Sequence, residues 1–230
     1  MLRSLAARWP RLRPLLRAAI VAAGWPACTA GEGPLVAFLG DSLTSGWRLR
    51  EEEAYPALVA RALAERGRPV RVINAGLSGD TAAGALARLP AVLKRRPEVL
   101  VVALGVNDGL GTGSLPEAEA ALDRILVEAR AAGARVLLVG VRLGTGPSAP
   151  LVGVTAGDAE RASRLFDAYV RLAATHRVAF VPDLLAGVAG RTELLFPDRL
   201  HPNAAGQARL AENVLPQLAL VLAGIDAGRR

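Results

Sequence analysis

The chain has 230 residues, of which 52% are hydrophobic and only 4% aromatic. This length suits one domain whose core needs no metal or disulfide, and so few aromatic residues disfavour an aromatic-packed β-sandwich. The net charge of +7 does not indicate nucleic-acid binding, because residues 1–31 hold five arginines and no acid, which leaves +2 (7 minus 5) for the rest of the chain.

Residues 1–33 form a basic leader that we expect to precede the folded domain. Arginines come first, followed by the apolar stretch Ala18–Trp25 and small residues at Ala27–Ala30, which resembles an export signal. A disordered arginine-rich extension is the alternative, and "WPAC" at Cys28 weakly resembles a lipoprotein cleavage box. The sequence therefore predicts a periplasmic or secreted protein if the leader is a signal, and a cytoplasmic one otherwise.

Two further features of the sequence narrow the class of protein. No apolar run approaches the roughly 20 residues that span a bilayer, so we expect no stable membrane span. Cys28 is the only cysteine, which excludes an intramolecular disulfide and a cysteine-based metal site. Because Cys28 precedes the predicted fold, a cysteine nucleophile is also disfavoured.

From residue 34 onward, apolar runs alternate with Ala-, Leu-, Arg- and Glu-rich segments of helical period. Near-continuous apolar runs are typical of strands covered on both faces. Pro116 suits a first helical turn, and Gly67 and Gly133 suit helix exits. The predicted strands are 35–39, 70–74, 99–104, 135–141 and 178–182, and the predicted helices are roughly 53–66, 80–94, 116–132, 158–175 and 203–222.

This alternation predicts a single α/β domain over residues 34–230. Repeated βα units form a parallel sheet with right-handed crossovers, so helices cover both faces in a three-layer α/β/α sandwich. Two long irregular segments interrupt the pattern, at 142–158 and around 183–200. Loops of this length are more often functional than idle.

Polar groups follow the predicted strands at the edge where α/β sheets bind ligands. Gly40-Asp41-Ser42 follows the first strand, Asn74 to Asp80 follows the second, and Gly105 to Asp108 follows the third. Asp198 to Pro202 lies some way after the fifth. We therefore expect these groups to gather at one edge of the sheet.

Ser42, His201 and Asp198 are the candidates for nucleophilic catalysis. A serine nucleophile needs a base within hydrogen-bond reach and a third group that orients the base. Asp198 precedes His201 by three residues, so its carboxylate can reach back to the imidazole in a turn. The alternative for His201 is a structural histidine at a helix start. His176, the other histidine, lies on a helix-to-strand turn without such a companion and is interpreted as a surface or helix C-terminal residue.

Acyl transfer also needs hydrogen-bond donors for an oxyanion. Ser42 offers its own N–H at a helix start, a glycine of "GLSGD" (Gly76 or Gly79) offers an unobstructed N–H, and Asn107 offers a side-chain amide. A turn-forming role is the alternative for Asn107 and for both glycines. Asp41 is interpreted as a turn-stabilising acceptor and not as a catalytic acid.

Four blocks in order, "GDSLTSGW" (40–47), "NAGLSGD" (74–80), "LGVND" (104–108) and "DRLHPN" (198–203), resemble those of the GDSL, or SGNH, hydrolase family. The stretches around 73–90 and 104–110 resemble most closely its arylesterase, acyl-CoA thioesterase I and lysophospholipase branch. The resemblance covers about residues 35–222 and implies a flavodoxin-like sandwich that hydrolyses acyl esters or thioesters without a metal or cofactor. Its implied partner is a small acyl ester or thioester.

The resemblance also implies roles for individual residues. Ser42 matches the nucleophile, Asp198 the acid and His201 the base of the triad. The oxyanion donors are the Ser42 N–H, the Gly79 N–H, because the glycine of "SGD" is the family's donor, and the Asn107 side chain. The segment at 142–158 departs from close relatives, which have a shorter loop with an Asn-Tyr-Gly-like stretch, so acyl-chain preference does not carry over.

Three other functions are alternatives to this prediction. "GLGTG" (109–113) follows a strand, as in dinucleotide-binding proteins, but its glycine spacing and its place after the third strand do not fit that motif. A binding module without catalysis would lack a member of the triad or an oxyanion donor, and none is missing. A carbohydrate O-acetylesterase on the same fold is the main alternative to an aryl or lipid acylester hydrolase.

Overall fold

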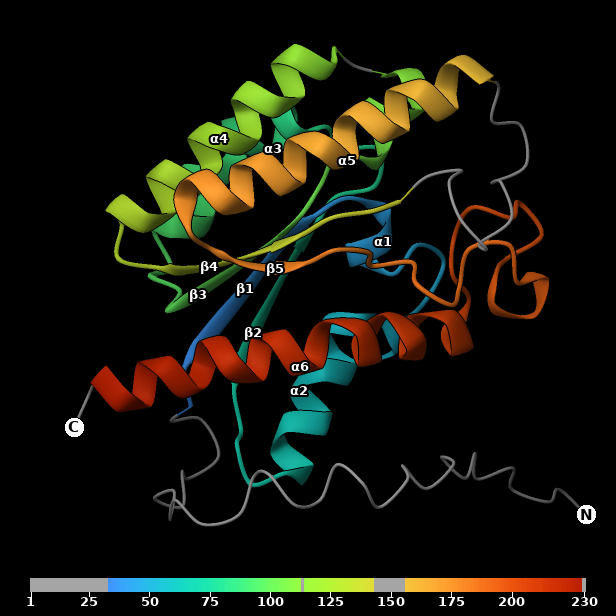
Figure 1. Ribbon diagram of the computed structural model, residues 1–230. Helices are drawn as coiled ribbons and strands as arrows, with labels where there is room; N and C mark the ends of the chain where they lie inside the picture. The colour runs from blue at the N-terminus through green and yellow to red at the C-terminus, as the bar shows by residue number, and fades with distance from the viewer. Residues whose placement is uncertain (1–32, 113, 143–155, 229–230) are drawn as a thin grey trace, which may run out of the picture.

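The centre of the protein is a five-stranded parallel sheet, seen in a computed structural model that describes residues 33–112, 114–142 and 156–228 (Figure 1). Its strands are β1 (Leu35–Gly40), β2 (Arg71–Gly76), β3 (Val99–Ala103), β4 (Arg135–Val139) and β5 (Ala179–Val181). They are arranged in the order β2-β1-β3-β4-β5. This order is that of flavodoxin-like sheets, in which the strand order reverses at a switch point between β1 and β3. The predicted fold class is therefore confirmed.

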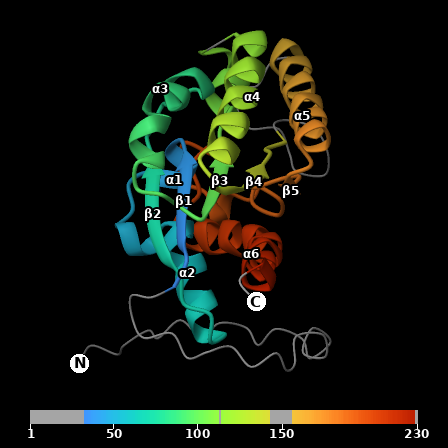
Figure 2. The same ribbon diagram turned by 90° about the vertical axis from the view of Figure 1, so that its left-hand side faces the viewer.

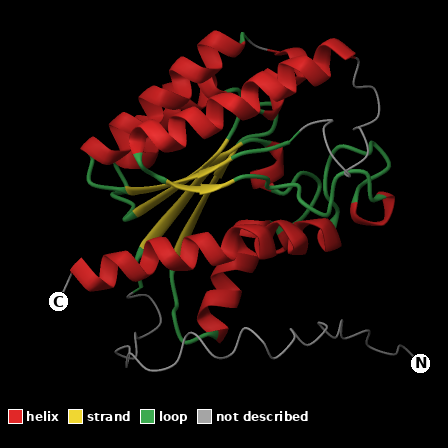
Figure 3. Ribbon diagram, viewed as in Figure 1, coloured by secondary structure: helices red, strands yellow, loops and turns green. Residues whose placement is uncertain are grey.

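Helices cover both faces of this sheet, as the alternating pattern predicted (Figures 2 and 3). On one face lie α2 (Tyr55–Glu65) and α6 (Ala204–Gly228). On the other lie α3 (Ala82–Leu93), α4 (Leu115–Ala131) and α5 (Ala156–His176). Short helical turns complete the fold at α1 (Ser42–Ser45), Glu51–Glu53, Asp108–Thr112 and Thr192–Leu194.

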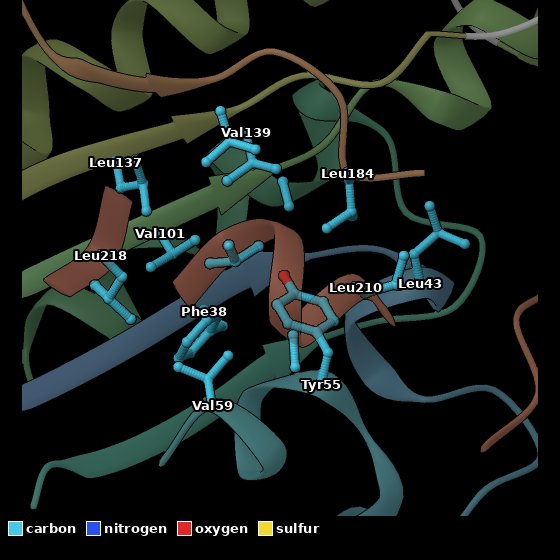
Figure 4. Close-up of a cluster of buried hydrophobic side chains, with 14 of the residues drawn as sticks. Phe38, Leu43, Tyr55, Val59, Val101, Leu137, Val139, Leu184, Leu210 and Leu218 are labelled. Carbon is cyan, nitrogen blue, oxygen red and sulfur yellow. The ribbon is translucent and has the colours of Figure 1, made fainter. Parts of the chain in front are cut away.

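Alternate residues of the strands serve the two helical layers. Phe38 of β1 packs with α2 and α6, whereas its neighbour Leu39 packs with α3 and α4. Successive side chains of a strand point to opposite faces, so a strand with helices on both sides needs an unbroken apolar run. Figure 4 shows the α2–α6 side of this core, where Tyr55 and Val59 lie close to Phe38 and Val101. The edge strands β2 and β5 are only partly buried.

The element boundaries follow the prediction closely at most helix and strand ends. Pro116 lies in the first turn of α4, and Gly67 and Gly133 follow α2 and α4. Helix α6 extends to Gly228, beyond the predicted end at residue 222. The helix start expected at Ser42 is α1, for which no range was predicted, and the helical turn at Asp108–Thr112 was not predicted, because segments this short carry no periodicity. The leader up to residue 32 and most of the predicted loop at 142–158 lie outside the described residues.

Helix α6 is long and apolar enough in composition to cross a membrane. In this fold, however, its buried face packs into the core with the sheet and α2, through residues such as Leu210, Leu218 and Leu222. Its apolar character is therefore explained by the core that it covers.

Candidate active site

Three chain segments leave the sheet side by side at the carboxyl ends of β1, β2 and β3. Gly40 is in register with Gly76 on one side and with Ala103 on the other. The segments that start at Asp41, Leu77 and Leu104 therefore leave the sheet at the same level. The expected gathering of the first three sequence blocks at one edge follows from this register.

Ser42 is the first residue of α1, a single helical turn directly after β1. Asp41 is its N-cap, and the Asp41 Oδ1 accepts a 2.9 Å hydrogen bond from the Leu43 N–H. This is the turn-stabilising role predicted for Asp41. The side chain of Ser42 is largely covered, because the residue as a whole is only 9% exposed. Its N–H lies at the N-terminal end of the turn, where backbone donors are left without helical partners.

The hydroxyl of Ser42, the imidazole of His201 and the carboxylate of Asp198 form a hydrogen-bonded chain. The His201 Nε2 lies 2.9 Å from the Ser42 Oγ, although 159 residues separate them in sequence. The His201 Nδ1 lies 2.9 Å from the Asp198 Oδ2. In this arrangement one ring nitrogen is available to the serine proton while the other is held by a carboxylate.

Asp198 is held in place by its own turn. Its Oδ1 accepts 3.0 Å hydrogen bonds from the backbone N–H groups of Leu200 and His201. Burial alone would raise the pKa of this carboxyl, but these two N–H groups and the His201 imidazole lower it below its usual value. Asp198 is therefore a carboxylate at neutral pH, and its Oδ2 can accept a hydrogen bond from the Nδ1 side of the His201 ring.

The predicted oxyanion donors lie on the neighbouring segments. Gly79 has a φ of 79° in the turn closed by the 3.1 Å bond from the Asp80 N–H to the Leu77 carbonyl, a backbone conformation that favours glycine. The Asn107 Nδ2 donates a 2.7 Å bond to the Asp80 carbonyl. Since an amide nitrogen carries two hydrogens, this bond fixes the plane in which the second one lies.

The backbone separates the roles of the two glycines in "GLSGD". A Cβ on Gly76 would lie 2.3 Å from the Ser45 nitrogen, so Gly76 allows α1 to approach β2. A Cβ on Gly79 would meet no atom within 4 Å among the described residues. No hydrogen bond within the described part of the chain uses the N–H of Ser42 or of Gly79. Neither N–H group is therefore engaged by an acceptor among the described residues.

Arg88 of α3 forms hydrogen bonds with the ends of β1 and β2. It was not among the predicted site residues. Its Nε donates a 2.7 Å bond to Asp80 Oδ2 in an ion pair, and its two terminal nitrogens donate to the carbonyls of Ala75 (2.6 Å) and Gly40 (2.9 Å). One guanidinium thus joins the ends of β1 and β2 to the turn that holds Gly79. Nothing local in the alanine-rich helix sequence distinguishes Arg88 from a surface arginine.

Buried acids surround the same turn. Burial raises the pKa of Asp41 from 3.8 to about 7, with smaller contributions from the nearby charges of Asp80 and Asp108 and an opposing effect of the Leu43 N–H. Burial also raises the pKa of Asp108, whose Oδ2 accepts a 3.1 Å bond from the Ala82 N–H at the start of α3. An acid of the third sequence block thus accepts an N–H from the first turn of α3, whose N-cap is Thr81.

Other polar groups and hollows lie away from Ser42. His176 ends α5, as predicted, but it has an acidic partner that was not predicted: the Asp123 Oδ1 of α4 is 2.7 Å from its Nε2. A hollow of about 320 Å³ is lined by Arg130, Arg135 and Arg177 among others. Arg130 and Arg135 donate to carbonyls in the last turns of α5 and α6, so they cap helix C-termini.

Over the described ranges, no group of three or more His, Cys, Asp or Glu side chains is arranged to hold a metal ion.

Comparison with known proteins links this geometry to a family of hydrolases. Residues 38–209 match the GDSL-like lipase/acylhydrolase family. The chain is 39% identical to "Esterase TesA" of Pseudomonas aeruginosa over 78% of this chain and 85% of that protein. It is 35% identical to "Thioesterase 1/protease 1/lysophospholipase L1" of Escherichia coli over 78% and 81%, respectively. A crystal structure of TesA superposes with a TM-score of 0.72 at 37% identity, covering 81% of this chain and 99% of that one.

Proposed function

Because the chain belongs to the GDSL-like lipase/acylhydrolase family, we propose that it hydrolyses carboxylic esters and thioesters through an acyl-enzyme on Ser42. The observation that carries this proposal is the hydrogen-bonded chain from Asp198 through His201 to Ser42, with 2.9 Å at both links. Asp198, held as a carboxylate by two backbone N–H groups, orients the imidazole. The Nε2 of His201 then accepts the serine proton as the Ser42 Oγ attacks the substrate carbonyl.

The oxyanion formed in this attack is assigned three donors. These are the N–H of Ser42, the N–H of Gly79 and the side-chain amide of Asn107. Preorganised donors at such a position are each worth roughly 10²–10³ in turnover. His201 next protonates the leaving alkoxide or thiolate, which breaks the bond between the carbonyl carbon and the leaving group. Water then attacks the acyl-enzyme with His201 as base, and the acid is released with Ser42 restored.

The proposed substrate class is an acyl chain joined to an aryl, thiol or glycerophospho-alcohol leaving group, as in aryl esters, acyl-CoA thioesters and lysophospholipids. The proposal rests on the relatives, which are named esterase, thioesterase and lysophospholipase. A carbohydrate O-acetyl ester requires the same chemistry at the carbonyl. The two classes differ in chain length and in the leaving group, so they are separated by a substrate panel.

Hydrolysis of p-nitrophenyl esters from acetate to palmitate by the full chain, beside its Ser42→Ala variant, tests the proposal. Acyl-CoA thioesters and an acetylated xylo-oligosaccharide complete the panel. We expect Ser42→Ala to lose nearly all hydrolysis while its circular dichroism spectrum stays that of the unsubstituted protein. Unchanged turnover in Ser42→Ala would end the hypothesis. Activity confined to the acetylated sugar would favour the O-acetylesterase.

We also propose that residues 1–33 act as an export signal that precedes a hydrolase domain over residues 34–230. The proposal rests on the basic, apolar and small-residue order of the leader. Expression of the full chain with a C-terminal tag in a Gram-negative host, followed by periplasmic extraction and N-terminal sequencing, is the test. A processed protein in the periplasm is expected, whereas an uncleaved cytoplasmic protein would indicate a plain extension.

A further inference from the structure

The segment that carries Asp198 and His201 is shaped by its own hydrogen bonds. The Phe196 N–H donates to the His201 carbonyl at 2.8 Å, and the Arg199 N–H donates to the Phe196 carbonyl at 2.9 Å. Asp198 accepts from two N–H groups of the same turn. These bonds fix the shape of the segment but not its distance from Ser42, which lies on a different part of the chain.

The side chain of Trp47, which follows the helical turn that begins at Ser42, contacts this segment. Trp47 follows Gly46, the left-handed residue with φ of 72° that ends α1. The Trp47 N–H donates a 3.2 Å hydrogen bond to the Ser42 carbonyl. The indole therefore extends from the same short turn as the Ser42 hydroxyl and is fixed relative to it by the backbone.

The indole of Trp47 contacts both ends of the Phe196–His201 segment. It is stacked on the His201 imidazole with 4.1 Å between ring centroids and 24° between planes. It also meets the Phe196 ring edge-on, at 5.9 Å and 81°. A stacked ring opposes rotation of the imidazole about its Cβ–Cγ bond, a rotation that would break its hydrogen bonds to Ser42 and Asp198. The face of an indole also favours a cation, and the imidazole becomes one when it takes the serine proton.

We propose that Trp47 is a positioning residue, whose indole holds the His201 imidazole and its segment against Ser42. This inference rests on the proposed function, since it takes His201 as the base. It predicts that Trp47 acts on the rate of the chemical step and not on substrate affinity. It further predicts that a flat aromatic ring is what the position requires, because an aliphatic side chain fills space without a face for stacking.

Trp47→Leu and Trp47→Phe, made in the full chain, test this proposal directly. With the p-nitrophenyl ester that the unsubstituted protein hydrolyses best, we expect kcat of Trp47→Leu to fall by about tenfold to 100-fold. The KM of this variant should change by less than about threefold. Trp47→Phe should recover most of kcat. Arg48→Ala is the comparison variant, because the Arg48 guanidinium carbon lies 4.2 Å from the Trp47 ring centroid, so this change removes a neighbour of the indole but keeps the ring that stacks on His201.

A second measurement isolates the step between Ser42 and His201. In the reaction with diethyl p-nitrophenyl phosphate, the Ser42 Oγ bonds to phosphorus, p-nitrophenolate leaves, and His201 takes the serine proton. The rate constant of this single turnover should fall in Trp47→Leu and recover in Trp47→Phe. Far-UV circular dichroism and the urea midpoint of each variant show whether it is folded, so a loss of structure is not mistaken for a loss of positioning.

Three results would overturn the proposal. These are full kcat in Trp47→Leu, an equal loss in the Leu and Phe variants, or a rise in KM at unchanged kcat, which would make Trp47 a wall of the substrate site. Failure of the proposed function is distinguishable, because it would leave Ser42→Ala as active as the unsubstituted protein. A dead Ser42→Ala variant beside a fully active Trp47→Leu variant would remove only the role of Trp47.

Discussion

Asp41→Asn should make the stability of this protein less dependent on pH. The Asp41 carboxyl is only 1% exposed, and among the described residues its Oδ2 has no hydrogen-bond partner. Burial, the largest cause, raises its pKa from 3.8 to about 7. Between these two values the folded protein binds a proton that the unfolded chain has released, so the free energy of unfolding falls as pH rises from about 4 to about 7.

The size of this effect follows from the shift in pKa. A rise from 3.8 to about 7 corresponds to a cost of at most about 4 kcal/mol above pH 7, since one pKa unit is worth about 1.4 kcal/mol. An asparagine is neutral at every pH, and its Oδ1 still accepts from the Leu43 N–H. We therefore expect the difference in unfolding free energy, Asp41→Asn minus the unsubstituted protein, to rise by about 2–4 kcal/mol between pH 4 and pH 8.

Urea unfolding at closely spaced pH values, followed by both fluorescence and circular dichroism, measures this difference. Coincident transitions by the two probes are required before a free energy is assigned. Asp167→Asn, which removes an exposed carboxylate of α5, is the matched control and should show little change over the same range. If the difference for Asp41→Asn stays within about 0.5 kcal/mol from pH 4 to pH 8, the carboxylate is not desolvated and the reasoning is refuted.

Three further substitutions test the remaining parts of the site. Asn107→Ala should lower kcat by roughly 10²–10³ with little change in KM, and a loss mainly in KM in steady-state kinetics would contradict its role as an oxyanion donor. Arg88→Met leaves Asp80, whose side chain is 7% exposed, without its cation, and should cost about 3–5 kcal/mol in urea unfolding and lower kcat. Unchanged turnover would show that Gly79 does not depend on this support. Gln207→Met removes the bonds to the Tyr55 N–H and the Leu43 carbonyl and should cost about 2–3 kcal/mol in the same assay, which a measured cost near zero would contradict.

Local sequence patterns were sufficient to predict the elements and the candidate residues. The run "LVAFL" predicted a strand over 35–39, and β1 spans Leu35–Gly40. Its unbroken apolar character reports burial on both faces, which a short window of sequence records because successive side chains alternate. The motif after each strand was readable for a similar reason, since the end of a strand, its turn and the first helical residues are neighbours in the chain.

Contacts between distant segments were decided only by the tertiary structure. Arg88 lies in an ordinary amphipathic helix by sequence, yet it donates to the carbonyls of Gly40 and Ala75. The stacking of Trp47 on His201 likewise joins segments with no local relation. The charge count could not foresee that Asp41, Asp80 and Asp108 share one buried region, because it sums charges without their positions.

The sequence by itself thus determined the strands and helices, their parallel arrangement, and the serine, aspartate and histidine that follow the strands. The strand order β2-β1-β3-β4-β5 was implied by the family resemblance and not by periodicity, and the tertiary structure decided the support that Arg88 gives to the strand ends and the contact of Trp47 with the His201 ring. The physical reason is the range of the interactions. Periodicity and turn chemistry act between near neighbours, whereas strand pairing and side-chain packing depend on free energies summed over residues far apart in the chain.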